Sequence, residues 1–129
     1  MYKTNFDLKE VIFLDIILVG IGGGIGALLR YVFGKLIKDN TDFYIPVNTM
    51  IINIIGSFLL GVSVVKMNDH HLATLVQTGV LGGFTTFSTF MVEGFGLLKE
   101  DGLKYMLKYL IPTVVLGIIF FLIGARMFL

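Results

Sequence analysis

The sequence contains no cysteine and no tryptophan, only two prolines, and few charges for its 129 residues. Without cysteine, the chain has no disulfide, no thiolate metal site and no cysteine nucleophile. Charged residues make up 15% and leave a net charge of +1, which gives no reason to expect nucleic acid as a partner. Hydrophobic residues make up 56% and the mean hydropathy is +0.90, which excludes an ordinary soluble domain and is typical of a membrane protein. This length predicts one domain, residues 1–129.

What the chain does have is four apolar segments, each suited to one transmembrane helix. They run from about Val11 to Ile37, from about Pro46 to Val65, through the uncharged stretch Leu72 to Val92, and from about Leu103 to Phe128. The first segment lacks the basic start and the cleavage site of a signal peptide, so we expect a retained helix. The prediction is an all-α membrane protein with four transmembrane helices.

Glycines are concentrated in the first segment. Gly20 and Gly24, and likewise Gly22 and Gly26, are four residues apart, the spacing that lets membrane helices approach closely. A phosphate-binding glycine loop would need a preceding strand, and none is predicted. We therefore interpret these glycines as packing residues.

The third segment is the least regular of the four. Gly82 and Gly83 weaken a helix, and four hydroxyl residues crowd around three phenylalanines directly after them. These residues are Thr85, Thr86, Ser88 and Thr89, with Phe84, Phe87 and Phe90. Non-helical backbone is tolerated at membrane depth only where it is buried in protein or lines a watery cavity. The pattern predicts a third helix broken near its middle, with carbonyls and hydroxyls turned toward a polar ligand such as an ion.

The second segment carries a polar face. Thr49, Asn53, Ser57 and Gly61 recur every four residues and so lie along one side of a helix. The Asn53 carboxamide needs partners at membrane depth. It fits an interhelical hydrogen bond and a pore-lining donor equally well, and the sequence leaves both open.

Polar residues continue beyond the predicted break. Thr86, Thr89, Phe90 and Glu93 fall on one helical stripe, and an ionisable residue within a membrane segment is a functional candidate by default. Glu93 lies late in its segment, so a position at the membrane surface is the alternative.

In the fourth segment, Tyr105, Tyr109 and Thr113 form a second polar track at four-residue steps. Tyr105, at the end of the segment, also fits an interfacial aromatic belt.

Charged residues outside these tracks have simpler interpretations. Asp15 and Arg30 flank the uncharged core of the first segment and are expected near the two membrane surfaces. His70 and His71 lie in a short polar connection after Asp69. Two adjacent histidines on a loop supply too few ligands for a specific metal site, so we predict a solvated loop.

The basic residues give only a weak orientation signal. Four spans place both termini and the middle connection on one side of the membrane. That side carries four basic residues and the opposite side six: Lys3, Lys9, Lys66 and Arg126 against Arg30, Lys35, Lys38, Lys99, Lys104 and Lys108. Because basic residues in short loops set orientation, this small bias predicts insertion both ways round. A thin four-helix chain with unpaired polar groups predicts a homodimer, which is antiparallel if both orientations are equally populated.

Three motifs, in order, resemble the Fluc (CrcB) fluoride channels. They are GGGIGALLRY from Gly22 to Tyr31, NIIGSFLLG from Asn53 to Gly61, and GGFTTFSTF from Gly82 to Phe90. The third motif is highly specific. The resemblance implies a multi-pass protein of the cell (inner) membrane that exports fluoride passively through two pores of an antiparallel dual-topology homodimer.

The resemblance also implies roles for individual residues. Those expected to line the fluoride path are Asn53, Phe87, Phe90, Ser88, Thr89, Glu93, Tyr109 and Thr113. The backbone carbonyls of Gly82 and Thr85, from both subunits, would hold a structural sodium ion at the dimer interface. Arg30 matches the arginine that ends the first motif.

Two other functions compete with this one. A small four-helix, proton-coupled multidrug exporter would need a carboxylate deep in its substrate cavity, and neither Asp15 nor Glu93 fits that position well. A non-transporting scaffold would pass no ions in pure form. The sequence shows no pairing of nucleophile and base, so no enzyme is predicted.

Overall fold

The computed structural model describes residues 5–40 and 43–129, so Lys3 lies outside the described residues. Four helical stretches are long and apolar enough to cross a membrane, as predicted. The first two spans are α1 (Asn5–Asp39) and α2 (Val47–Lys66), and the last is α6 (Leu103–Arg126). The third is composite: α3 (His70–Ala73), the π-helix η1 (Thr74–Leu81), α4 (Gly82–Phe84) and α5 (Phe87–Glu100).

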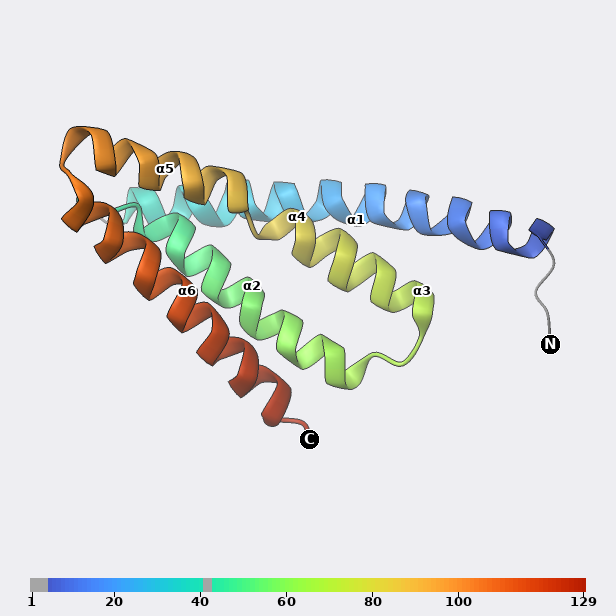
Figure 1. Ribbon diagram of the computed structural model, residues 1–129. Helices are drawn as coiled ribbons and strands as arrows, with labels where there is room; N and C mark the ends of the chain where they lie inside the picture. Colours follow the sequence, from blue (N-terminus) through green and yellow to red (C-terminus); the bar gives the residue numbers. More distant parts are fainter. Residues whose placement is uncertain (1–4, 41–42) are drawn as a thin grey trace.

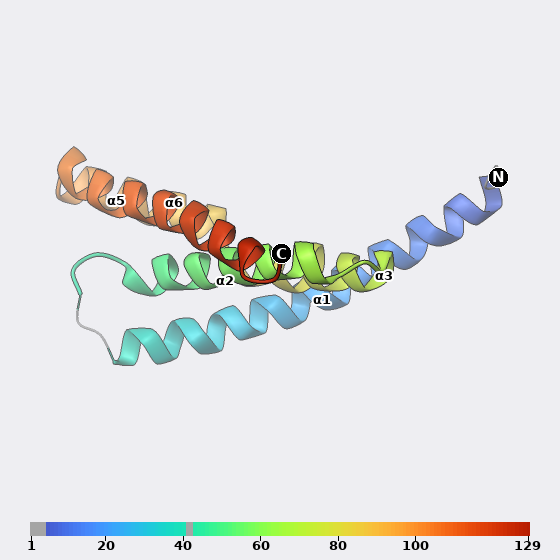
Figure 2. The same cartoon turned by 90° about the horizontal axis from the view of Figure 1, so that it is seen from below.

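The spans run back and forth between two ends of the molecule (Figure 1). The N-terminus, the C-terminus and the α2–α3 connection lie toward one end, while the α1–α2 connection and the α5–α6 turn lie at the other. α2 packs along α6, and α1 packs along η1 and α4. The first turns of α1 extend beyond α3, as Figure 2 shows from below.

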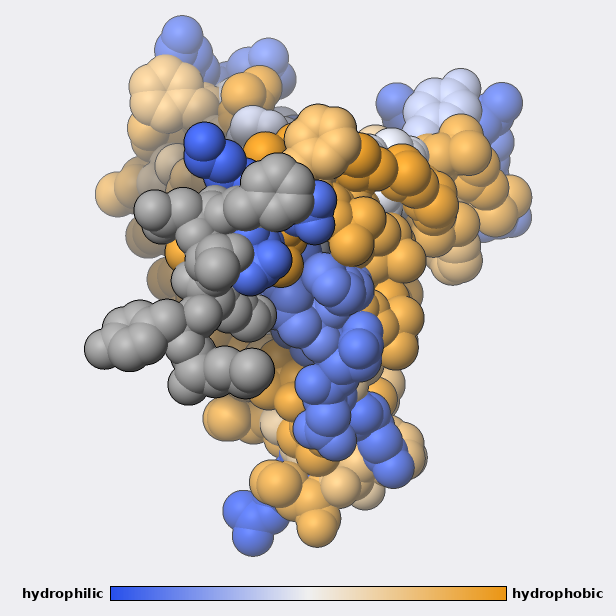
Figure 3. All heavy atoms as spheres, turned by 90° about the vertical axis from the view of Figure 1, so that its right-hand side faces the viewer, coloured by the Kyte–Doolittle hydropathy of each residue, from blue (hydrophilic) through white to orange (hydrophobic). Residues whose placement is uncertain are grey.

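Seen from the end with the N-terminus, polar residues form a band flanked by apolar ones (Figure 3). Large apolar side chains such as Leu28 on α1 and Leu122 on α6 are exposed along the spans. An exposed apolar surface of this extent suits lipid or a second copy of the chain rather than water. The polar band marks one membrane surface.

Glycines allow α1 to lie against the third span. A Cβ atom on Gly22 would come within 2.9 Å of Gly79 Cα, and one on Gly26 would overlap the Val80 carbonyl oxygen. The packing interpretation is therefore confirmed for Gly22 and Gly26. A Cβ on Gly20 or Gly24 would meet no atom of the described residues within 4 Å, so these residues give the two glycines no packing role.

A polar contact ties the two connections at the other end together. The Tyr44 hydroxyl donates a hydrogen bond to the Asp101 carboxylate, and this bond is the main cause that raises the pKa of Tyr44 to about 12. The Tyr44 ring also packs edge-on against Tyr105, with centroids 5.6 Å apart. Tyr105 is 38% exposed, which supports its interpretation as an interfacial residue.

Candidate functional site

The third span is broken at Thr85 and Thr86, as predicted from its hydroxyl-rich stretch. α4 ends at Phe84, both threonines are extended (φ −76°, ψ 159° and φ −145°, ψ 122°), and α5 begins at Phe87. Gly82 and Gly83 are still helical, and the helix ends one residue after them, at Phe84. Gly83 serves packing, because a Cβ there would overlap the Gly23 carbonyl oxygen of α1.

Hydroxyl groups stabilise both sides of the break. Thr85 Oγ1 donates to the Leu81 carbonyl at 2.9 Å, which closes the last turn before the break. Thr86 is the N-cap of α5, where its hydroxyl accepts from the Thr89 amide at 3.2 Å. A cap of this kind satisfies one of the amides that a helix start leaves without a partner.

Asn53 on α2 completes the break from across the bundle. Its Nδ2 donates to the Thr86 carbonyl at 3.0 Å, and its Oδ1 accepts from the Thr86 amide at 2.8 Å. The carboxamide thus replaces the two main-chain partners that Thr86 loses by leaving the helix. The interhelical hydrogen bond is confirmed. A carboxamide has two N–H donors, so one stays available to a ligand.

Two clefts meet at the break. The first has a volume of about 480 Å³ and the second about 400 Å³. Polar and aromatic groups lining the first include Asn53, Ser57, Thr86, Phe87, Phe90 and Thr113. Those lining the second include Arg30, Lys35, Lys38, Thr49, Thr86, Thr89 and Glu93. Because Thr86 lines both clefts, a ligand moving from one to the other would pass the Asn53–Thr86 pair.

The two phenylalanines of the motif line the first cleft from different depths. Phe87 is 75% exposed on this chain, whereas Phe90 is only 6% exposed. Their ring centroids are 6.2 Å apart, and the Phe90 ring lies 5.3 Å from that of Tyr109. The structure brings both predicted rings to one cavity and leaves Phe87 at the surface of the chain.

Glu93 is half-buried between α2, α5 and α6. Its carboxylate accepts hydrogen bonds from Thr49 Oγ1 at 3.0 Å and from the Tyr109 hydroxyl at 2.8 Å. Tyr109 is fully buried, and Thr113, one turn further along α6, donates to the Tyr109 carbonyl at 2.6 Å. The predicted polar tracks of the second, third and fourth spans therefore converge on Glu93.

One predicted position needs correction. Arg30 does not lie at a membrane surface: its Nη1 donates to the Thr85 carbonyl at 3.4 Å, near the middle of the third span. Arg30 also lines the second cleft. Its spacing of four from Gly26 could have revealed this position, since both then lie on the face of α1 that meets the third span. Ser88 is exposed and lines neither cleft.

Residues 17–125 match the family model described as CrcB-like protein, Camphor Resistance (CrcB). A protein of Clostridium acetobutylicum named fluoride-specific ion channel FluC 2 is 40% identical over 111 residues, which cover 86% of this chain and 95% of the relative. The Aquifex aeolicus protein named fluoride-specific ion channel FluC is 39% identical over 82% of this chain and 90% of its own length. A third relative, FluC 1 of Ligilactobacillus salivarius, is 44% identical over 78% of this chain and 88% of its own length.

With its four spans, this chain is a multi-pass protein of the cell membrane. It belongs to the CrcB family.

Proposed function

We propose that this chain forms a channel that passes fluoride passively across the cell membrane. The observation that carries the proposal is the line of hydrogen-bond donors that leads from the first cleft, past Asn53 and Thr86, to the second. Family membership points the same way, because the relatives are named fluoride-specific ion channels. A channel is not an enzyme. The site has only to replace the water around the ion with hydrogen-bond donors of the protein.

The lining suits a small, strongly hydrated anion. Amide and hydroxyl donors from Asn53 and Thr89 replace water around the ion. The positive edges of the Phe87 and Phe90 rings contact the ion without holding it tightly. Conduction needs several weak sites of this kind. Arg30, Lys35 and Lys38 line the second cleft and raise the local anion concentration at one mouth of the path.

A second copy of the chain completes this path. Residues on either side of the break lie exposed on a single chain: Gly82, Phe87, Ser88 and Thr89 all face outward. Lipid offers no hydrogen-bond partner to the Ser88 and Thr89 hydroxyls at this depth. We infer that an antiparallel partner covers this surface, so that each homodimer holds two paths. In this arrangement Ser88, which lines no cleft of its own chain, belongs to the lining shared with the partner.

The same interface would suit a structural sodium ion. Hard cations take oxygen ligands, and the Gly82 and Thr85 carbonyls of two copies supply four. The space beside Gly82 is open, since a Cβ there would lie 3.9 Å from the nearest atom, the Gln77 carbonyl oxygen. Arg30 contacts the Thr85 carbonyl but occupies only one of its two lone pairs. Replacing sodium by N-methylglucamine should lower the melting temperature of the purified dimer, whereas an unchanged temperature would contradict a bound sodium ion.

The exporter and the scaffold both lack support. The Glu93 carboxylate accepts hydrogen bonds from Thr49 and Tyr109, and it lies late in its span rather than deep in the first span. Membership of the CrcB family also supports the channel over a multidrug exporter.

The decisive experiment is efflux from proteoliposomes loaded with equal concentrations of fluoride and chloride. A fluoride electrode should record rapid release without a pH gradient, while a chloride electrode should record almost none. Equal efflux rates for the two ions would contradict fluoride selectivity. Dependence on a pH gradient would favour an exporter, and the absence of any flux would favour a scaffold.

A further inference from the structure

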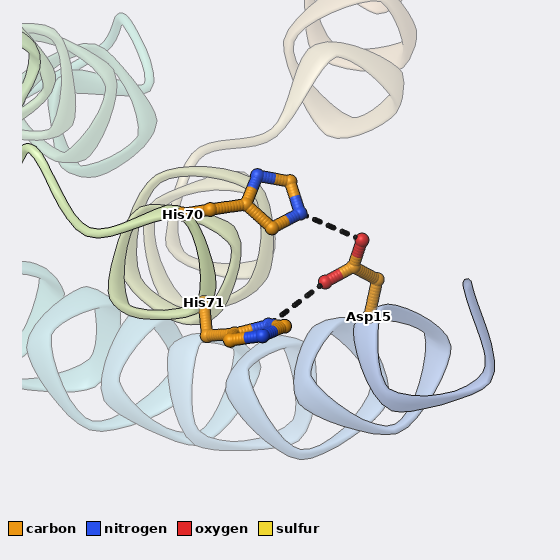
Figure 4. Close-up of side chains that lie close together, drawn as sticks. All are labelled: Asp15, His70 and His71. Carbon is orange, nitrogen blue, oxygen red and sulfur yellow. Dashed lines mark hydrogen bonds and ion pairs between the residues drawn. The ribbon is translucent and has the colours of Figure 1, made fainter. Parts of the chain in front are cut away.

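The chain has only two histidines, and the fold brings both to one aspartate on another helix (Figure 4). His70 and His71 begin α3, and Asp15 lies on α1, 55 positions before His70. His70 Nε2 is 2.9 Å from Asp15 Oδ2, and His71 Nδ1 is 3.4 Å from Asp15 Oδ1. In the sequence, two adjacent histidines supply only two ligands, which is why no metal site is predicted there. The third ligand could not be found from the sequence, since it depends on how α1 packs against the third span.

The three side chains have the geometry of a small metal site. One ligand atom from each lies within 4.8 Å of the others. A tetrahedral zinc ion with bonds of about 2.0–2.1 Å places its ligand atoms about 3.3 Å apart, between the two measured separations. Two imidazoles and one carboxylate are the donors that zinc and neighbouring transition metals prefer, whereas calcium and magnesium require more oxygens.

An ion pair alone leaves part of this cluster unsatisfied. Asp15 Oδ1 and His71 Nδ1 are shielded from solvent and have no hydrogen-bond partner among the described residues. A shielded polar atom without a partner is unfavourable. A cation bound by both atoms would satisfy them together. The side chains of Asp15, His70 and His71 are 25%, 65% and 44% exposed, so an ion has access from water and a water molecule can fill the remaining coordination position.

The surroundings hold the two rings in place. Asp69 is the N-cap of α3, where its Oδ1 accepts from the Leu72 amide at 2.8 Å. This cap fixes the helical turn that carries both histidines. The cluster lies at the start of the third span, on the membrane surface opposite the α5–α6 turn, and shares no residue with either cleft of the fluoride path.

We propose that Asp15, His70 and His71 bind one divalent transition-metal ion, such as zinc. The ion holds α1 against the start of the third span at the membrane surface. This site is separate from the proposed channel function. Because the sequence holds no cysteine and no other histidine, the untagged protein offers no competing thiolate or imidazole ligand.

The test is zinc binding to the untagged, chelator-stripped protein in detergent, measured by calorimetry and by metal content after dialysis. We expect one zinc per chain and a higher melting temperature with zinc than with chelator. Asp15→Asn, His70→Gln and His71→Gln should each weaken binding at least about tenfold and abolish the zinc-dependent rise in melting temperature. Glu10→Gln, an exposed carboxylate on the same helix, is the matched control and should leave both results unchanged.

Cobalt supplies a second readout that a plain ion pair cannot imitate. The wild-type chain should give the visible absorption bands of cobalt in a low-symmetry site with nitrogen and oxygen ligands, and the Asp15→Asn chain should not. If Asp15→Asn assembles poorly, the double variant His70→Gln/His71→Gln carries the same test. Zinc binding that survives Asp15→Asn in a well-assembled dimer, or no saturable binding up to about 1 mM, would overturn the proposal.

Discussion

At the scale of single residues, Phe87 and Phe90 differ in ways that separate packing from ion contact. Phe90 is buried against Tyr109, so any substitution there disturbs the core as well as the path. Phe87 is exposed on its own chain and lines the first cleft, so a substitution there mainly removes the ring edge. Phe87 therefore gives the cleaner test.

We predict that Phe87→Leu lowers fluoride efflux from proteoliposomes at least about tenfold, which corresponds to roughly 1.4 kcal/mol of lost ion stabilisation. The melting temperature should stay close to the wild type, because little packing within the chain is lost, and gel filtration checks that the dimer proposed to cover Phe87 still assembles. Phe90→Leu should also lower efflux, but with a loss of stability of up to about 1.5 kcal/mol. Phe95→Leu, an exposed ring on the same helix outside both clefts, is the control. Normal efflux in the double variant Phe87→Leu/Phe90→Leu would show that both rings serve packing only.

Asn53 has both a structural and an ion-binding role in our proposal, and Asn53→Asp tests them together. The aspartate would still accept from the Thr86 amide but could not donate to the Thr86 carbonyl, which should destabilise the chain by about 1–3 kcal/mol. It would also place negative charge on an anion path, so fluoride efflux should stop. The same change at Asn68, in the exposed α2–α3 connection, should alter neither property. Wild-type efflux through a well-assembled Asn53→Asp dimer would exclude Asn53 from the path.

At the scale of elements, the sequence predicts the broken helix and the stretch that breaks, but not the exact residues. The hydroxyl-rich stretch and its glycines show that the middle of the third span is not ordinary helix. The exact position depends on Asn53, which lies 33 residues earlier in the chain and accepts and donates at Thr86. A partner so distant in sequence has no local signature. The π-helical segment η1 was not predicted for the same reason, since it lies where α1 glycines meet the third span.

The close approach of α1 to that span yields a test of the element packing. Gly26→Ala would drive a methyl group into the Val80 carbonyl, with backbone on both sides that cannot rotate away. We expect a loss of roughly 1–3 kcal/mol in stability, measured as a lower melting temperature in detergent. Gly96→Ala makes the same change in α5, where a Cβ would meet nothing within 4 Å, and should be neutral or slightly stabilising because alanine favours helix. Equal melting temperatures for the two variants would show that α1 is free to move away from the third span.

At the scale of the whole molecule, composition and periodicity were sufficient to predict the four spans and the polar faces that meet in the bundle. Which span packs against which was not predicted, because each helix is apolar nearly all round and lipid-facing and buried faces look alike in sequence. The corrected position of Arg30 bears on orientation. With Arg30 inside the span rather than at its end, the basic residues near the two surfaces are more evenly matched than the sequence count suggests. This balance strengthens the expectation that the chain inserts both ways round.

An antiparallel dimer makes a demanding prediction about chains that are forced into one orientation. Counted without Arg30, Lys9→Gln with Lys66→Gln leaves two basic residues at the end with the termini against five at the other. Asn68→Lys with Lys104→Gln and Lys108→Gln shifts the balance the other way, to five against three. Because basic loops stay on the cytoplasmic side, the two variants should insert in opposite orientations. Each variant alone would then lack an antiparallel partner and give little fluoride efflux from membrane vesicles, whereas coexpression of both should restore it.

Labelling of a single cysteine in place of Asn40 checks the orientation of each variant, which is straightforward in a chain without cysteine. Full efflux from either variant alone, with labelling confined to one side, would show that the working assembly is not an antiparallel dimer.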